Sequence, residues 1–570
     1  MVRIAVIDYE LCHPEKCGNF LCARLCPVNR KNEECIVKKD RIEGSVKRLR
    51  PFIIEEACIG CSICVNKCPF GAISIVNTPE QLKEEPIHRY GENEFAMFRL
   101  PVPVNGVTGL LGPNGVGKTT AMRILSGQMK PNLGNFESND DVTKELAKMH
   151  RGSELHDYFI EMSRHEKRAV YKPQQVSMIP NVTSGKVSDM LSTEMIKKLE
   201  LHNCSDRDIA ALSGGELQRL AIGVAISKDA DVYYIDEPSS YLDVRQRINT
   251  AKIIRERAKD KHFMVVEHDL ATMDFIADKI HIFYGVPGVY GIVSKPYAVR
   301  NGINAFLDGY LFEENVKIRD GIIFDEVERV KRGKGNTIAT FGSISHRMGS
   351  FELSVKEGEI YDNEVLGILG ANALGKTTFA KLLASGDLSK KMVISYKPQY
   401  IETEYAGSVR SILAGVAESE DFTILARQLD VERLMEKTVR NLSGGELQRV
   451  SILLCLAKKA DIYLLDEPSA YLDVDQRLAV AKAIRGRTAL VIDHDLLFLS
   501  YISDRTMVFT GESGKYGEAE MMGLREGFNK FLKEVGVTFR RDEESKRPRA
   551  NKPDSQKDRE QKERGEYFYA

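Results

Sequence analysis

Two loops in the chain have the composition that binds the phosphates of a nucleoside triphosphate. Residues 112–119, GPNGVGKT, follow a short apolar strand, and residues 370–377, GANALGKT, repeat the pattern. In such a loop the glycines let backbone N–H groups approach the phosphates, the lysine reaches the β- and γ-phosphates, and the hydroxyl binds Mg²⁺. We therefore predict two sites for ATP and Mg²⁺. The residues assigned to them are Gly112, Asn114, Gly115, Gly117, Lys118, Thr119 and Thr120 in the first loop and Gly370, Asn372, Gly375, Lys376, Thr377 and Thr378 in the second.

Each loop is followed, in the same order, by polar elements that could complete an ATPase. They are a glutamine in YKPQ, the segment LSGGELQ opening a helix, an apolar strand ending in Asp-Glu, and a histidine at the end of another strand. We expect the aspartate to hold Mg²⁺ through water and the glutamate to polarise the attacking water. A serine and glycines at a helix N-terminus suit a γ-phosphate. The first set is Gln174, Ser213, Gly214, Gly215, Glu216, Asp236, Glu237, Asp243 and His268, and the second is Gln399, Ser443, Gly444, Gly445, Glu446, Asp466, Glu467, Asp473 and His494.

Two kinds of role are assigned within these sets. Glu237, Glu467, His268 and His494 are the predicted catalytic residues. The predicted Mg²⁺ ligands are Thr119, Gln174, Thr377 and Gln399.

The chain contains this ATP-handling unit twice. Residues 212–243 return as residues 442–473, and twenty of the thirty-two paired positions are identical. The first unit carries an additional segment, roughly residues 135–168, so that Lys118 precedes Gln174 by 56 positions, against 23 in the second unit. A tolerated surface insertion would account for this segment.

Nine of the eleven cysteines lie before position 69. Residues 58–69 read CxxCxxCxxxCP, which is the run of bacterial ferredoxins, and residues 12–27 hold a looser copy. In two-cluster ferredoxins the fourth cysteine of each run ligates the other cluster. We therefore predict two 4Fe–4S clusters, one held by Cys12, Cys17, Cys22 and Cys68 and the other by Cys58, Cys61, Cys64 and Cys26.

Three cysteines remain outside this assignment. Cys35 is interpreted as a bystander, and the isolated Cys204 and Cys455 as small buried hydrophobic residues. Two structural zinc sites are the alternative, although zinc ribbons usually show two CxxC pairs far apart. Clusters with this spacing can either transfer electrons or brace the fold.

The composition is that of an ordinary globular protein. The 570 residues are 43% hydrophobic and 29% charged, with a formal net charge of −1. No apolar run approaches the ~18 residues that span a bilayer, and the N-terminus lacks a signal-peptide pattern. We expect a cytoplasmic protein with no membrane partner, in which local patches would have to bind any nucleic acid.

Changes in composition divide the chain into five segments. We predict a ferredoxin-like domain over residues 1–79, nucleotide-binding domains over 80–298 and 341–523, a linker over 299–340, and a second linker with a charged tail over 524–570. RNGINAFL at 300–307 recurs as REGFNKFL at 525–532, which suits either a hinge between the two units or simple helix packing. The tail from Glu543 is too polar to order by itself, and we expect it to lie draped on a surface.

Two further features depend on single residues. Adenine should stack on an aromatic residue upstream of each loop, with Tyr90 or Phe95 as the candidates for the first site and Phe351 for the second. Core packing is the alternative for each. Ala373 stands where the first loop has Gly115. If this position needs a positive φ, the Cβ costs about 1 kcal/mol.

The motifs between residues 90 and 530 resemble those of ATP-binding-cassette (ABC) ATPases. The resemblance implies an α/β fold with two P-loop domains arranged head to tail. In that family the phosphate loop of one cassette and the LSGGE segment of the other enclose one ATP. Asp243 would then lie at the seam, the interface between the two cassettes.

The whole chain, including the NKP and QKERGEYF segments of the tail, resembles subfamily E of the ABC proteins, the RNase L inhibitor or ribosome-recycling family. The resemblance implies an N-terminal α+β two-cluster ferredoxin-like domain and a helix–loop–helix at residues 135–168. It also implies a monomer whose cassettes form an intramolecular dimer. The implied partners are the ribosome, mainly its small subunit, and a release factor or Pelota, and the implied activity is ATP-driven splitting of ribosomes into subunits.

Other classes of function fit fewer features. An ATP-gated iron–sulfur electron carrier would use the clusters as a redox relay. A transport ATPase would need transmembrane partners and has no obvious use for an iron–sulfur domain. A structural clamp in translation or DNA repair would use the cassettes alone. Stimulation of ATP hydrolysis by ribosomes separates the ribosomal function from all three.

Overall fold

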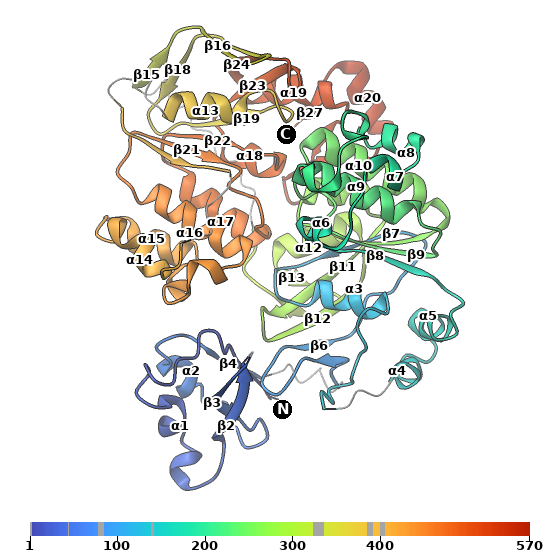
Figure 1. Cartoon of the computed structure of the whole chain (residues 1–570), viewed down its shortest axis with the longest axis vertical. Helices are drawn as coiled ribbons and strands as arrows, with labels where there is room; N and C mark the ends of the chain where they lie inside the picture. The colour runs from blue at the N-terminus through green and yellow to red at the C-terminus, as the bar shows by residue number, and fades with distance from the viewer. Residues whose placement is uncertain are drawn as a thin grey trace.

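The computed structural model describes residues 3–43, 45–77, 85–137, 142–322, 336–384, 392–399 and 405–569. An N-terminal head lies at one end of the molecule, and two α/β cassettes form the rest (Figure 1). The predicted boundary at residue 79 and residues 323–335 of the predicted linker lie outside the described residues.

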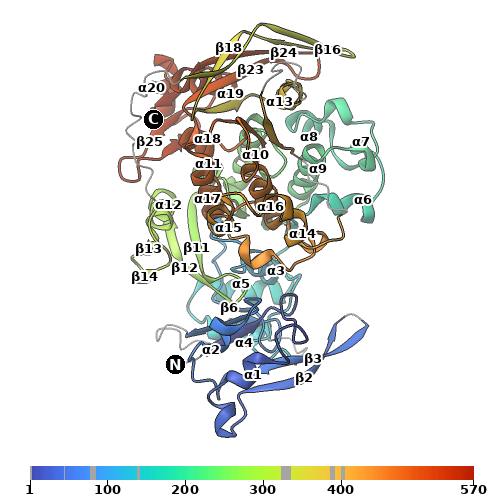
Figure 2. The same cartoon turned by 90° about the vertical axis from the view of Figure 1, so that its left-hand side faces the viewer.

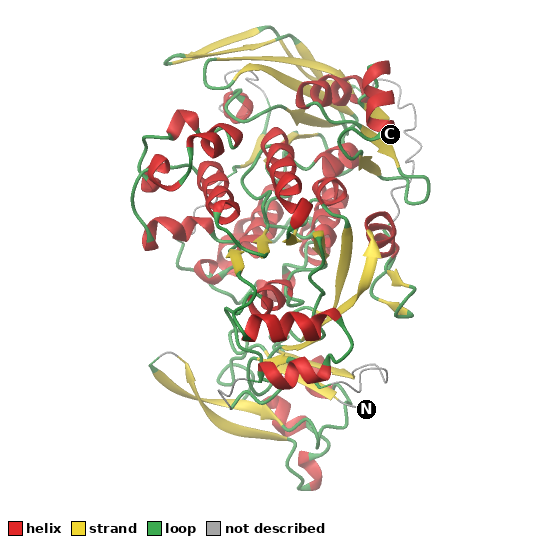
Figure 3. Cartoon of the chain, turned by 90° about the vertical axis from the view of Figure 1, so that its right-hand side faces the viewer, coloured by secondary structure: helices red, strands yellow, loops and turns green. Residues whose placement is uncertain are grey.

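The head is a small α+β unit with a projecting hairpin. Its elements are β1 (Arg3–Ile7), α1 (Leu21–Leu25), β2 (Ile36–Glu43), β3 (Val46–Ile53), α2 (Ile63–Lys67) and β4 (Ile73–Asn77). β1 pairs antiparallel with β4, and β2 with β3. The β2–β3 hairpin extends away from the body (Figures 2 and 3). Five cysteines belong to the buried core, which makes this core unusually rich in thiols.

The first cassette is built on an eight-stranded sheet in the order β5-β6-β12-β11-β7-β10-β9-β8. The strands are β5 (His88–Arg89), β6 (Ala96–Phe98), β7 (Gly106–Leu111), β8 (Ala169–Lys172), β9 (Val232–Asp236), β10 (His262–Val266), β11 (Lys279–Val286) and β12 (Tyr290–Ala298). β7, β8, β9 and β10 run parallel, and the apolar sequences of β7, β9 and β10 are almost wholly buried. Helices on both faces account for this burial.

The helices of the first cassette follow the strands that carry the motifs. They are α3 (Lys118–Leu125), α6 (Ile179–Val182), α7 (Val187–Met190), α8 (Thr193–Lys198), α9 (Gly214–Ser227), α10 (Val244–Arg257), α11 (Leu270–Ile276) and α12 (Val299–Asp308). The additional segment forms α4 (Thr143–Met149) and α5 (Glu154–Ser163), which pack against each other. Tyr158 on α5 donates its hydroxyl to the carbonyl of Leu125 at 2.6 Å, so this insertion is anchored beside the end of α3.

The second cassette repeats the topology, with the order β16-β17-β24-β23-β19-β22-β21-β20. Its strands are β16 (Ile344–Met348), β17 (Phe351–Val355), β19 (Val365–Leu369), β20 (Ile394–Lys397), β21 (Ile462–Asp466), β22 (Ala489–Ile492), β23 (Arg505–Glu512) and β24 (Tyr516–Gly523). Its helices are α13 (Lys376–Ala384), α14 (Val409–Leu413), α15 (Phe422–Gln428), α16 (Gly444–Leu456), α17 (Val474–Ile484), α18 (Leu496–Ile502) and α19 (Leu524–Val535). The duplicated sequence therefore produces a duplicated fold.

The charged tail is ordered and docks on the first cassette. It forms β25 (Phe539–Arg541), β26 (Pro548–Ala550), α20 (Gln556–Arg564) and β27 (Phe568–Tyr569). Arg547 is fully buried, and its guanidinium pairs with Asp274 on α11 at 2.5 Å. Arg549 also reaches Asp274, at 3.0 Å. Buried charge pairs thus hold the tail on the surface of the first cassette, because a partner in another domain neutralises its charge.

The largest apolar core contains side chains from both cassettes, so the two cassettes pack together. Within the part of the chain that the structure describes, no helix is both long enough and apolar enough to span a bilayer.

Candidate functional site

Each phosphate loop is contacted by an aspartate from the other cassette. The backbone N–H of Asn114 donates to Oδ2 of Asp473 at 3.0 Å, and that of Asn372 donates to Oδ2 of Asp243 at 3.0 Å. Each aspartate also caps the helix that follows it, α17 or α10, by accepting a backbone N–H. The helix N-terminus of one cassette is thereby fixed against the phosphate loop of the other.

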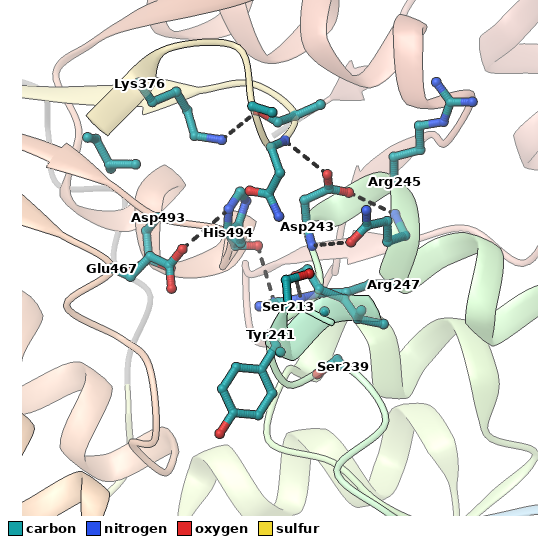
Figure 4. Close-up of a pocket in the computed structure, with 18 of the residues that line it drawn as sticks. Ser213, Ser239, Tyr241, Asp243, Arg245, Arg247, Lys376, Glu467, Asp493 and His494 are labelled. Carbon is teal, nitrogen blue, oxygen red and sulfur yellow. Dashed lines mark hydrogen bonds and ion pairs between the residues drawn. The ribbon is translucent and has the colours of Figure 1, made fainter. Parts of the chain in front are cut away.

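The second phosphate loop shares a cavity with the LSGGE segment of the first cassette. This cavity of about 960 Å³ is lined by Ser213–Glu216 and by Lys376 and Thr377. Figure 4 shows Ser213 and Asp243 on one side of it and Lys376 on the other. Ser213 caps α9, and its backbone N–H donates to the Glu216 carboxylate at 2.8 Å. The positive end of α9 therefore lies where a phosphate bound to the opposite loop could reach it.

The lysines of both loops are buried and held by loop carbonyls. Lys118 Nζ donates to the carbonyls of Gly112 and Pro113 at 2.7 and 2.6 Å, and Lys376 does the same in its own loop. Burial lowers the pKa of Lys118 to about 8, while Asp473 and Glu237 act in the opposite direction. Nearby anionic phosphates would favour the charged form of this amine.

A hydroxyl and a carboxylate meet beside each lysine, as a Mg²⁺ site requires. Thr119 Oγ1 donates to Asp236 at 2.9 Å, and Thr377 Oγ1 donates to Asp466 at 2.8 Å. Burial, and next the charge of Glu237, raise the pKa of Asp236 to about 6. Oxygen donors of this kind fit a hard divalent cation, and the positive charge of that cation would offset the cost of burying the carboxylate.

The two predicted catalytic glutamates are held between a glutamine and a histidine. Gln174 Nε2 donates to Glu237 Oε1 at 2.7 Å, and His268 Nε2 lies 3.6 Å from the same oxygen. The second site repeats this arrangement, with Glu467 at 2.7 Å from Gln399 and 3.6 Å from His494. Both glutamates have a positive φ, 46° and 48°. Left-handed backbone is costly for a residue with a side chain, and such strain clusters at functional positions.

The two histidines are buried and neutral at physiological pH. Burial, and next the positive charges of Lys118 and Arg477, hold the pKa of His268 well below its usual range. His494 is affected in the same way by burial, Lys376 and Arg247. A neutral imidazole can donate from one ring nitrogen and accept at the other, which suits a group beside the glutamate that is predicted to activate water.

The three predicted adenine-stacking residues lie near the phosphate loops. Tyr90 is 45% exposed, and its hydroxyl lies 3.0 Å from Thr120 Oγ1. A Cβ placed on Gly117 would lie 2.9 Å from the Phe95 ring. Phe351 packs against Gly375 in the same manner. Tyr90 is the most accessible of the three, and the ring of Phe95 restricts the adjacent loop position to glycine.

Ala373 has a φ of 60°, and Gly115, its counterpart in the first loop, has a φ of 79°. The second loop therefore holds the same left-handed turn with a Cβ present. The carbonyl of Ala373 accepts the N–H of Gly514 at 3.0 Å, and this hydrogen bond stabilises the strained turn.

Thiol groups of the head lie close to one another. Burial raises the pKa of Cys12 to about 12; Arg50 acts in the opposite direction, and the neighbouring thiols of Cys22, Cys68 and Cys17 add to the rise. Cys64 is likewise buried and lies near Cys58, Cys22 and Cys61. Thiolates suit iron because they are soft and anionic, so clustered thiols of this kind fit iron–sulfur chemistry. No single-ion site with three or more His, Cys, Asp or Glu side chains is found among the described residues.

Cys35 does not lie apart from these groups. Its side chain is 2% exposed and interacts with the thiols of Cys26 and Cys58. The N–H groups of Cys35 and Ile36 donate to Asn29 Oδ1 at 3.0 and 2.9 Å, which holds the start of β2 against the turn after Cys26.

Two arginines at the seam were not among the expected site residues. Arg247 on α10 and Arg477 on α17 each donate to a carbonyl of the opposite cassette. They occupy the same position of the internal repeat, in LDVRQR and LDVDQR. This identity is a signal in the sequence, but it does not say that the side chain crosses to the other cassette.

The fold and these sites define a pair of ATP-binding cassettes that meet head to tail, with a cysteine-rich head in front. A family model described as "ABC transporter" matches residues 97–240 and 353–470. Two others, "Possible Fer4-like domain in RNase L inhibitor, RLI" and "4Fe-4S binding domain", match residues 2–34 and 51–74. The chain belongs to subfamily E of the ABC proteins.

Relatives and a solved structure are similar over the full length. The chain is 47% identical to an uncharacterized ABC transporter ATP-binding protein of Methanocaldococcus jannaschii and 44% identical to translation initiation factor RLI1 of Saccharomyces cerevisiae. Both alignments cover 100% of this chain and 98% of the relative. A structure described as "Model of ribosome-bound archaeal Pelota and ABCE1" is 49% identical, with a TM-score of 0.93, covering 100% of this chain and 99% of the other.

Proposed function

We propose that this protein is an ATP-driven recycling factor that splits ribosomes into subunits after termination or stalling and stays with the small subunit. The observation that carries the proposal is the pair of cross-seam contacts between each phosphate loop and the other cassette. Such contacts make closure of the cassettes depend on what the loops bind. The similarity to a structure of ribosome-bound Pelota and ABCE1 supplies the partner on which closure acts. This work takes place in the cytoplasm, where ribosomes act.

Closure on ATP provides the work in this mechanism. A clamp driven from about 1:99 closed-to-open to 99:1 needs roughly 5.5 kcal/mol of differential binding, so each of two ATP molecules would supply about half. Lys376 and the N-terminus of α9 would bind the γ-phosphate of one ATP from opposite cassettes. Lys118 and the N-terminus of α16 would bind the other. Loss of the γ-phosphate after hydrolysis removes these contacts, and the clamp reopens.

Hydrolysis in each site uses a glutamate and a histidine. Glu237 and Glu467 would polarise the attacking water, and Gln174 and Gln399 hold these carboxylates in place at 2.7 Å. One Mg²⁺ per site would be held at Thr119 with Asp236, or at Thr377 with Asp466, and would neutralise charge on the phosphates. Gln174 and Gln399 stand as the further Mg²⁺ ligands.

We assign two 4Fe–4S clusters to the head. The ligand sets are Cys12, Cys17, Cys22 and Cys68 for one cluster and Cys58, Cys61, Cys64 and Cys26 for the other. Clusters of this type can carry an electron or cross-link a small domain. The thiol-rich core of the head favours cross-linking, since cysteines occupy positions where larger apolar side chains would otherwise pack.

We assign a hinge role to the repeated linker segments, because charged residues in and beside them pair with the tail and with the second cassette. Arg300 on α12 pairs with Asp542 at 3.0 Å, and Arg319 pairs with Asp475 on α17. We propose, with this assignment, the domain boundaries that composition indicates, at residues 79, 298, 340 and 523.

Sedimentation of ribosomes tests the proposal. Ribosomes, Pelota or a release factor, and ATP are mixed with the protein, and free subunits are scored on a gradient. We expect subunits only when protein, factor and ATP are all present, with the protein found in the small-subunit fraction. Intact ribosomes in the complete mixture, or ATP-independent splitting, would overturn it.

A further inference from the structure

Arg247 connects three parts of the seam through one guanidinium group. Its Nε donates to the carbonyl of Leu242 at 2.8 Å, in the turn that leads to Asp243. Its Nη1 donates to Asp269 at 2.9 Å and to the carbonyl of His494, in the second cassette, at 3.3 Å. Figure 4 shows Arg247 beside His494 at the seam.

Arg477 makes the mirror-image set of bonds. Its Nε donates to the carbonyl of Leu472 at 3.0 Å, and its Nη1 donates to Asp495 at 2.6 Å. The same Nη1 donates to the carbonyl of His268, in the first cassette, at 3.2 Å. We call the segments 268–269 and 494–495 the histidine loops. Each arginine thus binds one histidine loop through an aspartate and the other through a backbone carbonyl.

The two aspartates belong to the histidine loops themselves. Asp269 directly follows His268 and caps α11, and Asp495 directly follows His494 and caps α18. The side chains of both arginines are 15% exposed and those of both aspartates 6% exposed. Four nearly buried charges therefore join the two catalytic histidines by a continuous path that crosses the seam twice.

We propose that Arg247 and Arg477 are positioning residues that make hydrolysis in each ATP site depend on the closure of the other site. The proposal rests on the two-site ATPase described above. When the cassettes part, each arginine keeps its own aspartate and loses the carbonyl of the opposite histidine. When they close, both histidine loops are fixed together, because a shift of either loop moves an arginine that holds the other.

Arginine is suited to this role and lysine is not. A guanidinium presents five N–H donors in a rigid fork, so it can hold a carboxylate and two carbonyls in fixed directions. A lysine in its place would keep the ion pair with the aspartate and so avoid an unpaired buried carboxylate. It would not also reach the carbonyls in the same geometry. Arg→Lys variants therefore separate coupling from folding.

The test compares the two sites working together with each site working alone. ATP turnover is measured without ribosomes for the unmodified protein, for Glu237→Gln and for Glu467→Gln. If the sites are independent, the two single-site rates add up to the rate of the unmodified protein. Allosteric coupling is typically worth 5- to 150-fold, so we expect the sum to depart from that rate by at least about fivefold.

The same three rates are then measured with Arg247→Lys and Arg477→Lys together in each background. We expect the summed single-site rates and the two-site rate to differ by less than about twofold in these variants. The matched control is Arg255→Lys, since Arg255 also lies on α10 and binds one carboxylate and one carbonyl, those of Asp278 and Ile276, within its own cassette. This control should leave the departure unchanged.

A second readout needs no hydrolysis and covers lysine variants with too little turnover to measure. In the Glu237→Gln, Glu467→Gln background, closure of the cassettes is titrated with ATP. The protein that keeps both arginines should show a higher Hill coefficient than the protein in which both are lysine. The proposal is overturned if the unmodified protein shows independent sites, or if coupling and Hill coefficient persist in the lysine variants. Either result leaves the ribosome-splitting assay, and hence the proposed function, untouched.

Discussion

The backbone N–H of Asn114 lies 3.0 Å from Oδ2 of Asp473, although the two residues are 359 positions apart in the chain. Asn114 belongs to the phosphate loop of the first cassette, and Asp473 caps α17 of the second. This hydrogen bond joins the phosphate loop of one cassette to a charged group of the other. A shift of the loop therefore acts directly on the opposite cassette. The equivalent bond from Asn372 to Asp243 makes the relationship reciprocal.

Removing one of these aspartates should weaken closure. A hydrogen bond to a charged group contributes about 1.5–3 kcal/mol, so Asp473→Ala should raise the ATP concentration for half-maximal closure by about 10- to 150-fold. Distance-sensitive fluorescence between labels on the two cassettes measures this. Asp229→Ala, which removes a carboxylate that pairs with Arg168 on the surface, should have no effect. An unchanged midpoint for Asp473→Ala would show that the contact does not contribute to closure.

Replacing both predicted catalytic glutamates should trap ATP. Glutamine keeps the shape of the side chain but cannot polarise water as a carboxylate does, so Glu237→Gln with Glu467→Gln should bind two ATP molecules and remain closed. Nucleotide retained after rapid desalting, identified as ATP or ADP, provides the measurement. Rapid ADP formation by the double variant would exclude these glutamates as the groups that activate water.

The buried pair between Arg547 and Asp274 should be critical for stability. Breaking a buried ion pair by removing one partner costs about 3–5 kcal/mol, because it leaves an uncompensated charge. Asp274→Leu should therefore lower the thermal unfolding temperature clearly. Arg547→Met added to Asp274→Leu should restore much of the loss, since it removes the unpaired charge. If the double variant is no more stable than Asp274→Leu, the loss does not arise from an unpaired arginine.

Asp542 should make the docking of the tail sensitive to strong acid only. Burial alone would raise the pKa of Asp542, but hydrogen bonds from Ser545, Asn304 and Arg300 outweigh it and hold this pKa well below its usual range. A carboxylate with a lowered pKa stabilises the fold fully above the unfolded pKa of about 3.9 and loses that contribution as the pH falls further. Asp542→Asn should therefore be less stable than the unmodified protein at pH 7, and the difference should shrink below about pH 4. Chemical unfolding at several pH values measures it, and a difference that is constant with pH would contradict the assignment.

Iron analysis tests the two clusters in the head. Two 4Fe–4S clusters correspond to about eight iron atoms per chain in protein purified without air. Cys58→Ser should lower this number, whereas Cys204→Ser, which changes a buried thiol of the first cassette, should not. Zinc in place of iron would contradict the cluster assignment. Cys35→Ser should keep the full iron content if Cys35 is a bystander, and a loss of iron would make it a participant.

Local motifs could be predicted from the sequence because their chemistry depends on neighbouring residues. Lys118 and Thr119 belong to one loop, and Asp236 and Glu237 end one buried strand, so type and spacing were sufficient. The left-handed turn at Ala373 could be anticipated from Gly115 through the repeat. The internal duplication in the sequence corresponds to two sheets with the same strand order.

Contacts between distant segments could not be predicted in this way. Arg247 and Arg477 have the sequence context of ordinary helix-surface arginines, and their role depends on how the two cassettes meet. Arg547 lies in a polar stretch that cannot order itself, and it is buried only because α11 of the first cassette supplies Asp274. Spacing alone likewise could not place Cys35 beside Cys26 and Cys58.

The most direct test of the central claim is to trap orthovanadate with ADP in place of the γ-phosphate and to irradiate the complex with ultraviolet light, which cleaves the backbone nearest the vanadate. If each nucleotide is enclosed by both cassettes, cleavage should occur near Lys376 and near Ser213 for one site, and near Lys118 and Ser443 for the other. Cleavage confined to the two phosphate loops, with the LSGGE segments intact, would contradict the account.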